Sequence, residues 1–132
     1  MIRFTDVYKS FGPKTVLAGL TLDIPDGETT VIIGFSGTGK SVALKHIVGL
    51  MQPDAGTVEV DGQNVAELSQ SGLDALRGNV GYVFQFAALF DSMTVAENIR
   101  LGLKRRGLDE ETMETRIRES LRLVDLPGAE ER

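Results

Sequence analysis

The chain contains no cysteine among its 132 residues, which excludes disulfide bonds, thiol chemistry and metal sites built from thiolates. It also lacks an apolar run near the roughly 18 residues that a membrane-spanning helix needs, and residues 1–6 lack the apolar region of a signal peptide. Residues 104–106 form the only basic cluster, and the net charge is −5. Nucleic acid and anionic lipid surfaces are therefore not expected as direct partners, and any role at a membrane is expected to pass through a partner protein.

The composition that is present is typical of a globular protein. Hydrophobic residues make up 42% of the chain and charged residues 25%, and the length suffices for one domain with a hydrophobic core. The sequence has no internal repeat, low-complexity tract or linker. Its one shift in composition, from β-rich to helical near residue 87, predicts a boundary between residues 1–86, a β subdomain and core, and residues 87–132, the start of a helical subdomain.

One short motif organises the rest of the chain. Residues 34–41 read Gly-Phe-Ser-Gly-Thr-Gly-Lys-Ser, which fits the phosphate-binding pattern G-x-x-x-x-G-K-[ST] with a further glycine at Gly37. The preceding residues 29–33 are β-branched at every position and predict a strand that begins near Glu28. The following residues 42–51 are apolar enough for a buried helix. The predicted order of strand, glycine loop and helix is the context that a phosphate-binding loop requires.

The spacing of this motif follows from the chemistry of polyphosphates. Converging backbone N–H groups hold the phosphate oxygens, and glycines allow the tight bend and the close approach. The free amides and positive dipole end of the next helix add to this cradle. Lys40 is expected to reach the β- and γ-phosphates, and the Ser41 hydroxyl to ligate the Mg²⁺ that bridges them. The predicted phosphate site comprises Gly34, Ser36, Gly37, Thr38, Gly39, Lys40, Ser41 and Val42.

Further short elements are predicted on both sides of the loop. Alternating or apolar runs predict strands at residues 2–8, 15–24, 57–60 and 80–84, with Asp61-Gly62 as a tight turn and Gln85 at the end of the last strand. Predicted helices cover residues 71–77, then 94–106 with a Thr94/Glu97 capping box and a stop at Gly107, and then a helix capped by Asp109. The last helix is predicted to bury Met113, Ile117, Leu121 and Val124, with Glu114 paired to Arg118.

Other polar and apolar residues carry plain structural predictions. His46 is interpreted as a structural residue of the loop helix, since the chain has no second His or Cys to share a metal. Met93 and Met113 are interpreted as core residues, and residues 104–106 as a solvated helix end. The aspartates at positions 23, 26, 54 and 61 are interpreted as turn markers, because none has the flanking pattern of a general base.

Three stretches at set distances from the loop resemble one family. Residues 9–12, 51–56 and 80–85 together resemble the nucleotide-binding domain of ABC transporters. The resemblance implies that Phe11 stacks on adenine with Val16 beside it. It also implies that Gln85 ligates Mg²⁺ together with Ser41 and couples the ATP site to a transmembrane subunit. From the residues alone, Phe11 fits an ordinary core aromatic better than a binding residue, and Gln85 fits a polar strand end as well as it fits a ligand.

The resemblance also defines the expected fold and its extent. It implies an α/β P-loop NTPase of ABC type, in which an N-terminal antiparallel β subdomain joins a P-loop core that is truncated at the start of the helical subdomain. The family's LSGGQ signature, Walker B strand with its catalytic glutamate, D-loop and switch histidine have no counterpart in the sequence. Residues 68–72 imitate the signature but precede Gln85, and His46 lies too early to be the switch histidine. The chain therefore resembles about the first half of that domain.

The expected function follows from the same resemblance. Residues 37–47 and 86–99 look like the ATPase subunit of Mla-type transporters, which implies transport of phospholipid or a related lipid, powered by ATP binding and hydrolysis. The implied partners are a transmembrane permease and a second ATPase subunit, and the implied location is cytoplasmic, on the inner face of the cell membrane. Since no catalytic residue is identified within the chain, it is expected to bind ATP and Mg²⁺ at most. The alternatives are a soluble ABC ATPase without a permease and a nucleotide-binding module without turnover.

Overall fold

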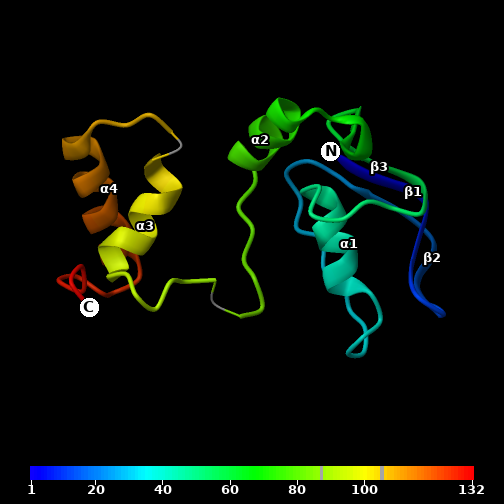
Figure 1. Cartoon of the computed structure of the whole chain (residues 1–132), viewed down its shortest axis with the longest axis horizontal. Coiled ribbons are helices and arrows are strands. Elements are labelled where there is room, and N and C mark those ends of the chain that lie inside the picture. Colours follow the sequence, from blue (N-terminus) through cyan, green and yellow to red (C-terminus); the bar gives the residue numbers. More distant parts are fainter. Residues whose placement is uncertain (87, 105) are drawn as a thin grey trace. The chain divides into compact units, whose positions relative to one another are not determined.

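The computed structural model describes residues 1–86, 88–104 and 106–132 (Figure 1). The chain divides into two compact units, Met1–Tyr82 and Val83–Arg132. The predicted subdomain boundary between residues 86 and 87 stays a prediction, since residue 87 lies outside the described residues, as does residue 105 of the basic cluster. No helix of the described ranges combines the length and the apolar character needed to cross a bilayer.

The first unit is built on an antiparallel sheet. Its strands are β1 Ile2–Phe11, β2 Lys14–Ile24, β3 Ala55–Val60 and β4 Gln63–Asn64, in the order β2-β1-β3-β4. The strands predicted near residues 2–8, 15–24 and 57–60 are therefore confirmed. The predicted turn between β3 and β4 is also confirmed, because Asp61 and Gly62 both have positive φ, at 51° and 78°, as a two-residue hairpin turn requires.

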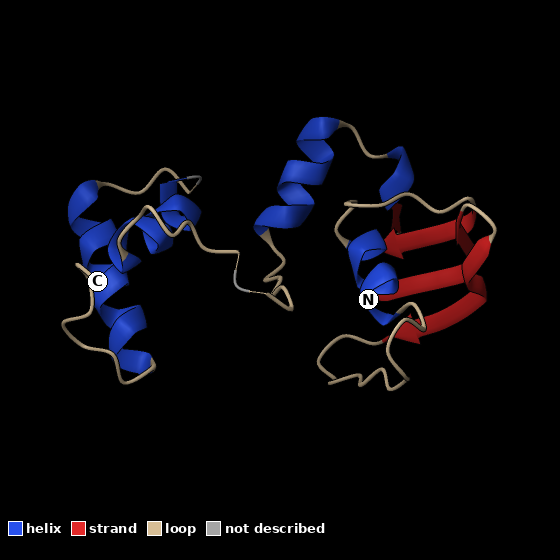
Figure 2. Cartoon of the chain, turned by 60° about the horizontal axis from the view of Figure 1, so that its bottom comes forward, coloured by secondary structure: helices blue, strands red, loops and turns tan. Residues whose placement is uncertain are grey.

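One face of the sheet carries the helix that follows the glycine loop. Helix α1 Lys40–Ile47 lies on this face (Figure 2) and contributes Ala43 and Ile47 to a core with Phe4, Val7 and Val58. The helix is shorter than predicted from residues 42–51, because Gly49 takes a left-handed φ of 64° and ends it. A 3₁₀ turn, η1 Val65–Glu67, and helix α2 Gln70–Gly78 follow β4, and Ser69 caps α2 by accepting from the Gly72 amide.

Arg77 connects α2 to the end of α1. Its Nε donates to the Val48 carbonyl oxygen at 2.9 Å and its Nη2 to the Gly49 carbonyl oxygen at 3.1 Å. Arg77 thereby satisfies carbonyls that the end of α1 leaves without a helical partner, and it places a positive charge at the negative end of the helix dipole.

We expect Arg77→Ala to lower the free energy of unfolding by about 1–3 kcal/mol, because two partly buried carbonyls lose a charged donor. Denaturant unfolding followed by circular dichroism measures the change. The matched control is Arg122→Ala, which removes an exposed arginine from the last turn of α4 and is expected to change stability by less than about 0.5 kcal/mol. Equal effects of the two substitutions would contradict the role of Arg77.

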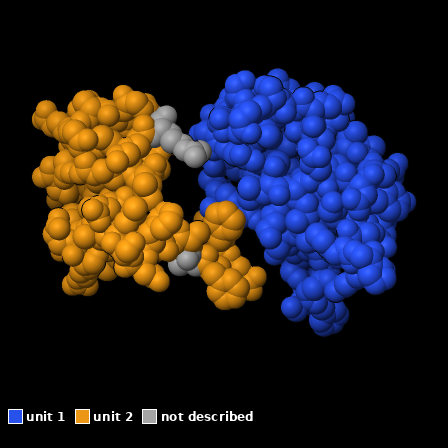
Figure 3. All heavy atoms as spheres, in the orientation of Figure 1, with its two compact units in different colours: residues 1–82 blue, residues 83–132 orange. Residues whose placement is uncertain are grey.

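The described residues of the second unit, which is orange in Figure 3, form helices α3 Val95–Lys104 and α4 Glu110–Leu123. The predicted capping box is confirmed, since Glu97 Oε2 accepts from the Thr94 amide at 2.8 Å and Thr94 Oγ1 accepts from the Glu97 amide at 3.2 Å. Asp109 caps α4 as predicted, accepting from the Thr112 amide at 2.9 Å. This amide, followed by the Thr112 hydroxyl, holds the pKa of the Asp109 carboxyl below its usual value.

Three predictions about residues of the second unit are wrong. Met113, Ile117 and Leu121 are buried as expected, but Val124 is 62% exposed, because the helix ends at Leu123 and its periodicity ends with it. The predicted Glu114 to Arg118 pair is wrong: the Glu114 carboxylate pairs with Arg100 of α3, and Arg118 Nε donates to the Glu114 carbonyl oxygen at 3.3 Å. Met93 is 37% exposed and is not a core residue.

Two predicted strands are not formed in the described residues. Residues 28–33 and 80–84 are irregular, and the strand pairings of the described chain are those of β1 with β2, β1 with β3 and β3 with β4. Val31, Ile33 and Val83 are accordingly 72%, 90% and 95% exposed. Local composition favours a strand, but a strand forms only where a hydrogen-bonded neighbour runs beside it, and composition does not reveal that neighbour.

Candidate nucleotide-binding site

The glycine loop leads directly into α1, whose first residue is Lys40. Gly39 caps the helix with φ 95° and ψ 3°, and its carbonyl oxygen accepts from the Ala43 amide at 2.8 Å. Within the described part of the chain, the amides of residues 40–42 donate to no other group of the protein. These free N–H groups at the positive end of the helix dipole are suited to anionic oxygens.

Two glycines of the loop are required by close contacts. At Gly39, a Cβ atom would lie 2.9 Å from Leu17 Cδ2 and 3.0 Å from the Val16 carbonyl oxygen, so β2 passes directly beside the loop. At Gly34, a Cβ atom would lie 2.7 Å from Thr38 Oγ1, a side chain of the loop itself. The loop can therefore lie against β2 and fold closely on itself because these two positions carry no side chain.

The Lys40 side chain folds back over the loop. Its Nζ donates to the carbonyl oxygens of Gly34 at 2.6 Å and Phe35 at 2.7 Å, and Thr38 Oγ1 also donates to the Phe35 carbonyl oxygen, at 2.8 Å. These bonds hold the ammonium group against the loop that leads into the first helical turn. A phosphate oxygen is a stronger partner for an ammonium group than a neutral carbonyl, so the group is placed to bind one.

An open pocket of about 290 Å³ joins the loop to the ends of β1 and β2. It is lined by Phe11, Lys14, Val16, Gly37, Gly39, Lys40, Ser41 and Val42. Seven of these eight residues belong to the site predicted from the sequence. The other loop residues of that prediction, Gly34, Ser36 and Thr38, lie in the same loop without lining the pocket.

Phe11 lies at the end of β1 and is 47% exposed. This exposure excludes the alternative interpretation of Phe11 as an ordinary core aromatic. The ring stands 5.8 Å from Lys9 Nζ, measured to its centroid. A half-exposed aromatic ring on the wall of an open pocket offers a surface on which a planar base can stack.

Lys14 is the pocket residue that sequence reasoning missed. It begins β2 opposite Phe11 in the strand register, and its Nζ would lie 3.9 Å from a Cβ atom placed at Gly37. A signal was available, because Lys14 and Val16 are two residues apart on one strand and therefore share a face. Lys14 adds a second positive charge to a pocket that already holds Lys40.

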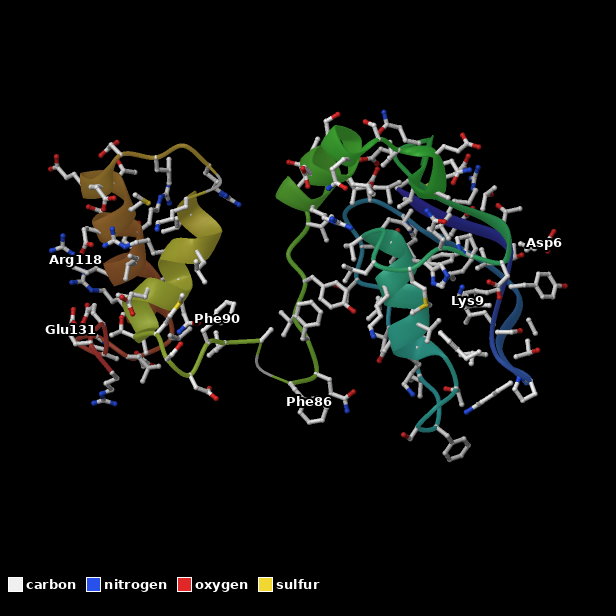
Figure 4. All side chains as sticks on the ribbon, in the orientation of Figure 1. Asp6, Lys9, Phe86, Phe90, Arg118 and Glu131 are labelled. Atoms are coloured by element: carbon white, nitrogen blue, oxygen red, sulfur yellow. The ribbon has the colours of Figure 1, made fainter. Side chains whose placement is uncertain are left out.

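Two further candidates lie outside this pocket. His46 is buried in α1 at 1% exposure, and its Nδ1 donates to the Val42 carbonyl oxygen at 2.7 Å, which confirms its structural role. Gln85 belongs to the second unit, in an exposed irregular segment beside Phe86. Phe86 and Phe90, both labelled in Figure 4, are 82% and 56% exposed. The role of Gln85 as a metal ligand stays a prediction.

A protein-family model described as ABC transporter matches residues 17–132. The chain belongs to the ABC transporter family. The resemblance drawn from the motifs is thereby confirmed. The α/β fold of ABC type is also confirmed by solved ABC cassettes, including the dimeric structure of MJ0796, a bacterial ABC transporter cassette. That structure matches with a TM-score of 0.90 at 30% identity, over 100% of this chain and 61% of the other. A structure of MJ0796 bound to ADP and Pi matches with a TM-score of 0.88 at the same identity and coverage.

Curated ABC relatives cover nearly the whole chain. Protein TRIGALACTOSYLDIACYLGLYCEROL 3, chloroplastic, of Arabidopsis thaliana is 43% identical over 134 residues, which are 100% of this chain and 38% of that protein. The methionine import ATP-binding protein MetN of Legionella pneumophila is 40% identical over 126 residues, covering 96% and 37%. The Fe(3+) ions import ATP-binding protein FbpC of Escherichia coli is 36% identical over 131 residues, covering 99% and 36%. The chain thus spans less than two fifths of the length of these relatives.

Proposed function

We propose that this chain is the ATP-binding part of the ATPase subunit of an ABC transporter. The observation that supports it most is the pocket in which Phe11 and Val16 lie at one side and the amides and ammonium group of residues 37–42 at the other. An aromatic surface next to a cluster of anion-binding groups matches the two chemically different ends of a nucleoside triphosphate.

Each part of the pocket then has a role. Lys40 and the free amides of the first turn of α1 hold the phosphates, and Phe11 with Val16 holds the base. Ser41 would supply an oxygen ligand to the Mg²⁺ that accompanies the triphosphate and neutralises charge on the phosphate oxygens. Gln85, which lies outside the pocket, is proposed as a second ligand on the family resemblance alone. The fit of the loop to phosphate rests on the free amides of residues 40–42, and Gly39 lets β2 pass directly beside them because it carries no side chain.

The proposal for the whole protein is ATP hydrolysis coupled to transport. A transmembrane permease and a second ATPase subunit are its proposed partners, and its proposed location is the cytoplasmic face of the cell membrane. The names of the relatives support a transport role, since MetN and FbpC are import ATP-binding proteins for methionine and iron. Phospholipid or a related lipid is the proposed substrate, on the likeness of residues 37–47 and 86–99 to Mla-type subunits.

Calorimetry with Mg·ATP tests the proposed binding directly. The full chain is expected to bind Mg·ATP and to bind it more tightly than Mg²⁺ with inorganic tripolyphosphate, because only ATP offers a base to Phe11. A chain that binds neither ligand would contradict the proposal.

Two experiments on the whole protein separate the alternatives. Phosphate release distinguishes an ATPase from a module that only holds nucleotide. Co-purification with a permease after membrane extraction distinguishes a transporter subunit from a soluble ABC ATPase.

A further inference from the structure

Asp54, which the sequence marks only as a turn residue, lies just before β3 and contacts the far end of β1. We propose that Asp54 is a positioning residue for base recognition: it holds the last residues of β1 so that Phe11 presents its ring to the pocket. This inference rests on the proposed binding of ATP. It adds a residue that does not itself line the pocket.

The contacts of Asp54 reach three consecutive residues of β1. Its Oδ2 accepts from the Ser10 amide at 2.7 Å, and its Oδ1 accepts from Lys9 Nζ at 2.9 Å. Its own amide donates to the Tyr8 carbonyl oxygen at 2.9 Å. Both carboxylate oxygens and the backbone of Asp54 are therefore bonded to the segment that ends in Phe11.

The register of the sheet explains why one side of this segment needs a partner. On the other side β2 pairs with it, up to Phe11 opposite Lys14. Pairing between β1 and β3 runs from Ile2 opposite Val60 to Tyr8 opposite Ala55, the first residue of β3, so it does not reach the last three residues of β1. Beyond that point the Asp54 carboxylate accepts from the Ser10 amide in place of a strand carbonyl. The Asp54 side chain thus supplies the hydrogen-bond acceptor that a longer β3 would otherwise supply, up to the residue before Phe11.

Lys9 connects Asp54 to the aromatic ring of Phe11. Its side chain, labelled in Figure 4, is only 17% exposed, and its ammonium group lies over the Phe11 ring at 5.8 Å from the centroid. Because Asp54 fixes this ammonium group, it also fixes the charge that lies over one face of the ring. Lys9 foremost, and then the Ser10 amide, hold the pKa of the Asp54 carboxyl below its usual value, so the carboxyl stays ionised at neutral pH.

The phosphate end of the pocket does not share these contacts. Among the described residues, Asp54 makes no hydrogen bond or ion pair with the loop of residues 34–41. Loss of its carboxylate is therefore expected to loosen the base end of the pocket and to leave the phosphate end intact. A purely structural role would weaken both ends together, and this difference distinguishes the two roles.

The test compares two probes in calorimetry on the full chain, Mg·ATP and Mg²⁺ with inorganic tripolyphosphate. Asp54→Ala is expected to weaken Mg·ATP binding on the order of tenfold, the value of one base stacked on one aromatic ring, and to leave tripolyphosphate binding unchanged. Asp54→Asn keeps an oxygen for the Ser10 amide but not the charge for Lys9, so a smaller loss is expected. If the Asp54→Ala variant fails to fold, the same two probes are compared on the Asp54→Asn variant.

Asp23→Ala is the matched control. Asp23 also joins a basic residue of β1, since it accepts from Arg3 Nε at 2.8 Å, but it lies outside the pocket. This variant is expected to bind both probes like the wild type. An equal loss of both probes in the Asp54 variants, or no loss of Mg·ATP, would overturn the positioning role. A wild type that binds tripolyphosphate as tightly as Mg·ATP would overturn the positioning role too. A wild type that binds neither probe would overturn the proposed function and, with it, this inference.

Discussion

Replacing Lys40 with alanine is expected to reduce Mg·ATP binding on the order of a hundredfold or more, since the variant loses charge-assisted bonds to phosphate oxygens. Lys40 is the pocket residue whose ammonium group bonds the loop carbonyls of Gly34 and Phe35, at 2.6 and 2.7 Å. Those carbonyls face solvent and can bond to water once the side chain is gone, so the fold is expected to tolerate the change. Calorimetry measures the loss, and circular dichroism verifies that helix content is retained.

Lys45→Ala provides the matched control for this prediction. Lys45 carries the same charge on the same helix, but it does not line the pocket, so its removal is expected to leave Mg·ATP binding within about twofold of the wild type. Lys40→Arg adds a second comparison. The planar guanidinium is larger than the ammonium point charge and is expected to restore only part of the affinity. Wild-type affinity in Lys40→Ala would show that the loop does not bind the phosphates.

Gly39→Ala is expected to damage both the fold and the site. The residue holds φ at 95°, which costs an L-residue about 1–2 kcal/mol. Its new Cβ would meet Leu17 Cδ2 at 2.9 Å and the Val16 carbonyl oxygen at 3.0 Å, and overpacking of this kind costs about 1–3 kcal/mol. We expect a loss of about 2–5 kcal/mol in the free energy of unfolding, measured with denaturant. Mg·ATP binding is also expected to fall below detection in calorimetry, because β2 and the first turn of α1 must move apart.

Gly102→Ala tests whether the loss of stability comes from the close contacts at position 39 or from any replacement of glycine by alanine. Gly102 lies inside α3 with an ordinary φ, and a Cβ atom added there would have no neighbouring atom within 4 Å. Alanine at this position is expected to stabilise the helix by about 0.5–1 kcal/mol and to leave nucleotide binding unchanged. A loss of stability at Gly102 similar to that at Gly39 would contradict the argument from close contact.

Local sequence signals predicted much of the fold correctly. The caps at Thr94 and Asp109 depend on side chains three residues from their partners, so their residue types are sufficient evidence. The turn at Asp61-Gly62 and the strand at residues 15–24 are equally local. The phosphate loop is predictable for the same reason, because its bend, its close approach and its lysine lie within one short segment.

Longer-range contacts explain the errors. Glu114 pairs with Arg100 of another helix instead of Arg118 on its own, and helical spacing alone does not rank these partners. The segments at residues 28–33 and 80–84 have the composition of buried strands, but they are irregular and do not belong to the sheet of the described chain. The Lys14 side chain becomes part of the pocket only because β2 passes beside the glycine loop.

The sequence by itself determined the family, the phosphate loop, the helix caps and the strands of the antiparallel sheet. Each of these depends on residue types at short, set spacings, where backbone geometry and hydrogen bonding act locally. The tertiary structure alone decided that Lys14 joins Phe11 and Val16 beside the loop, and that Asp54 contacts the end of β1. These residues meet because pairing places the end of β1 beside the start of β2 and the start of β3. The register that does so is a property of paired strands, which no single strand encodes.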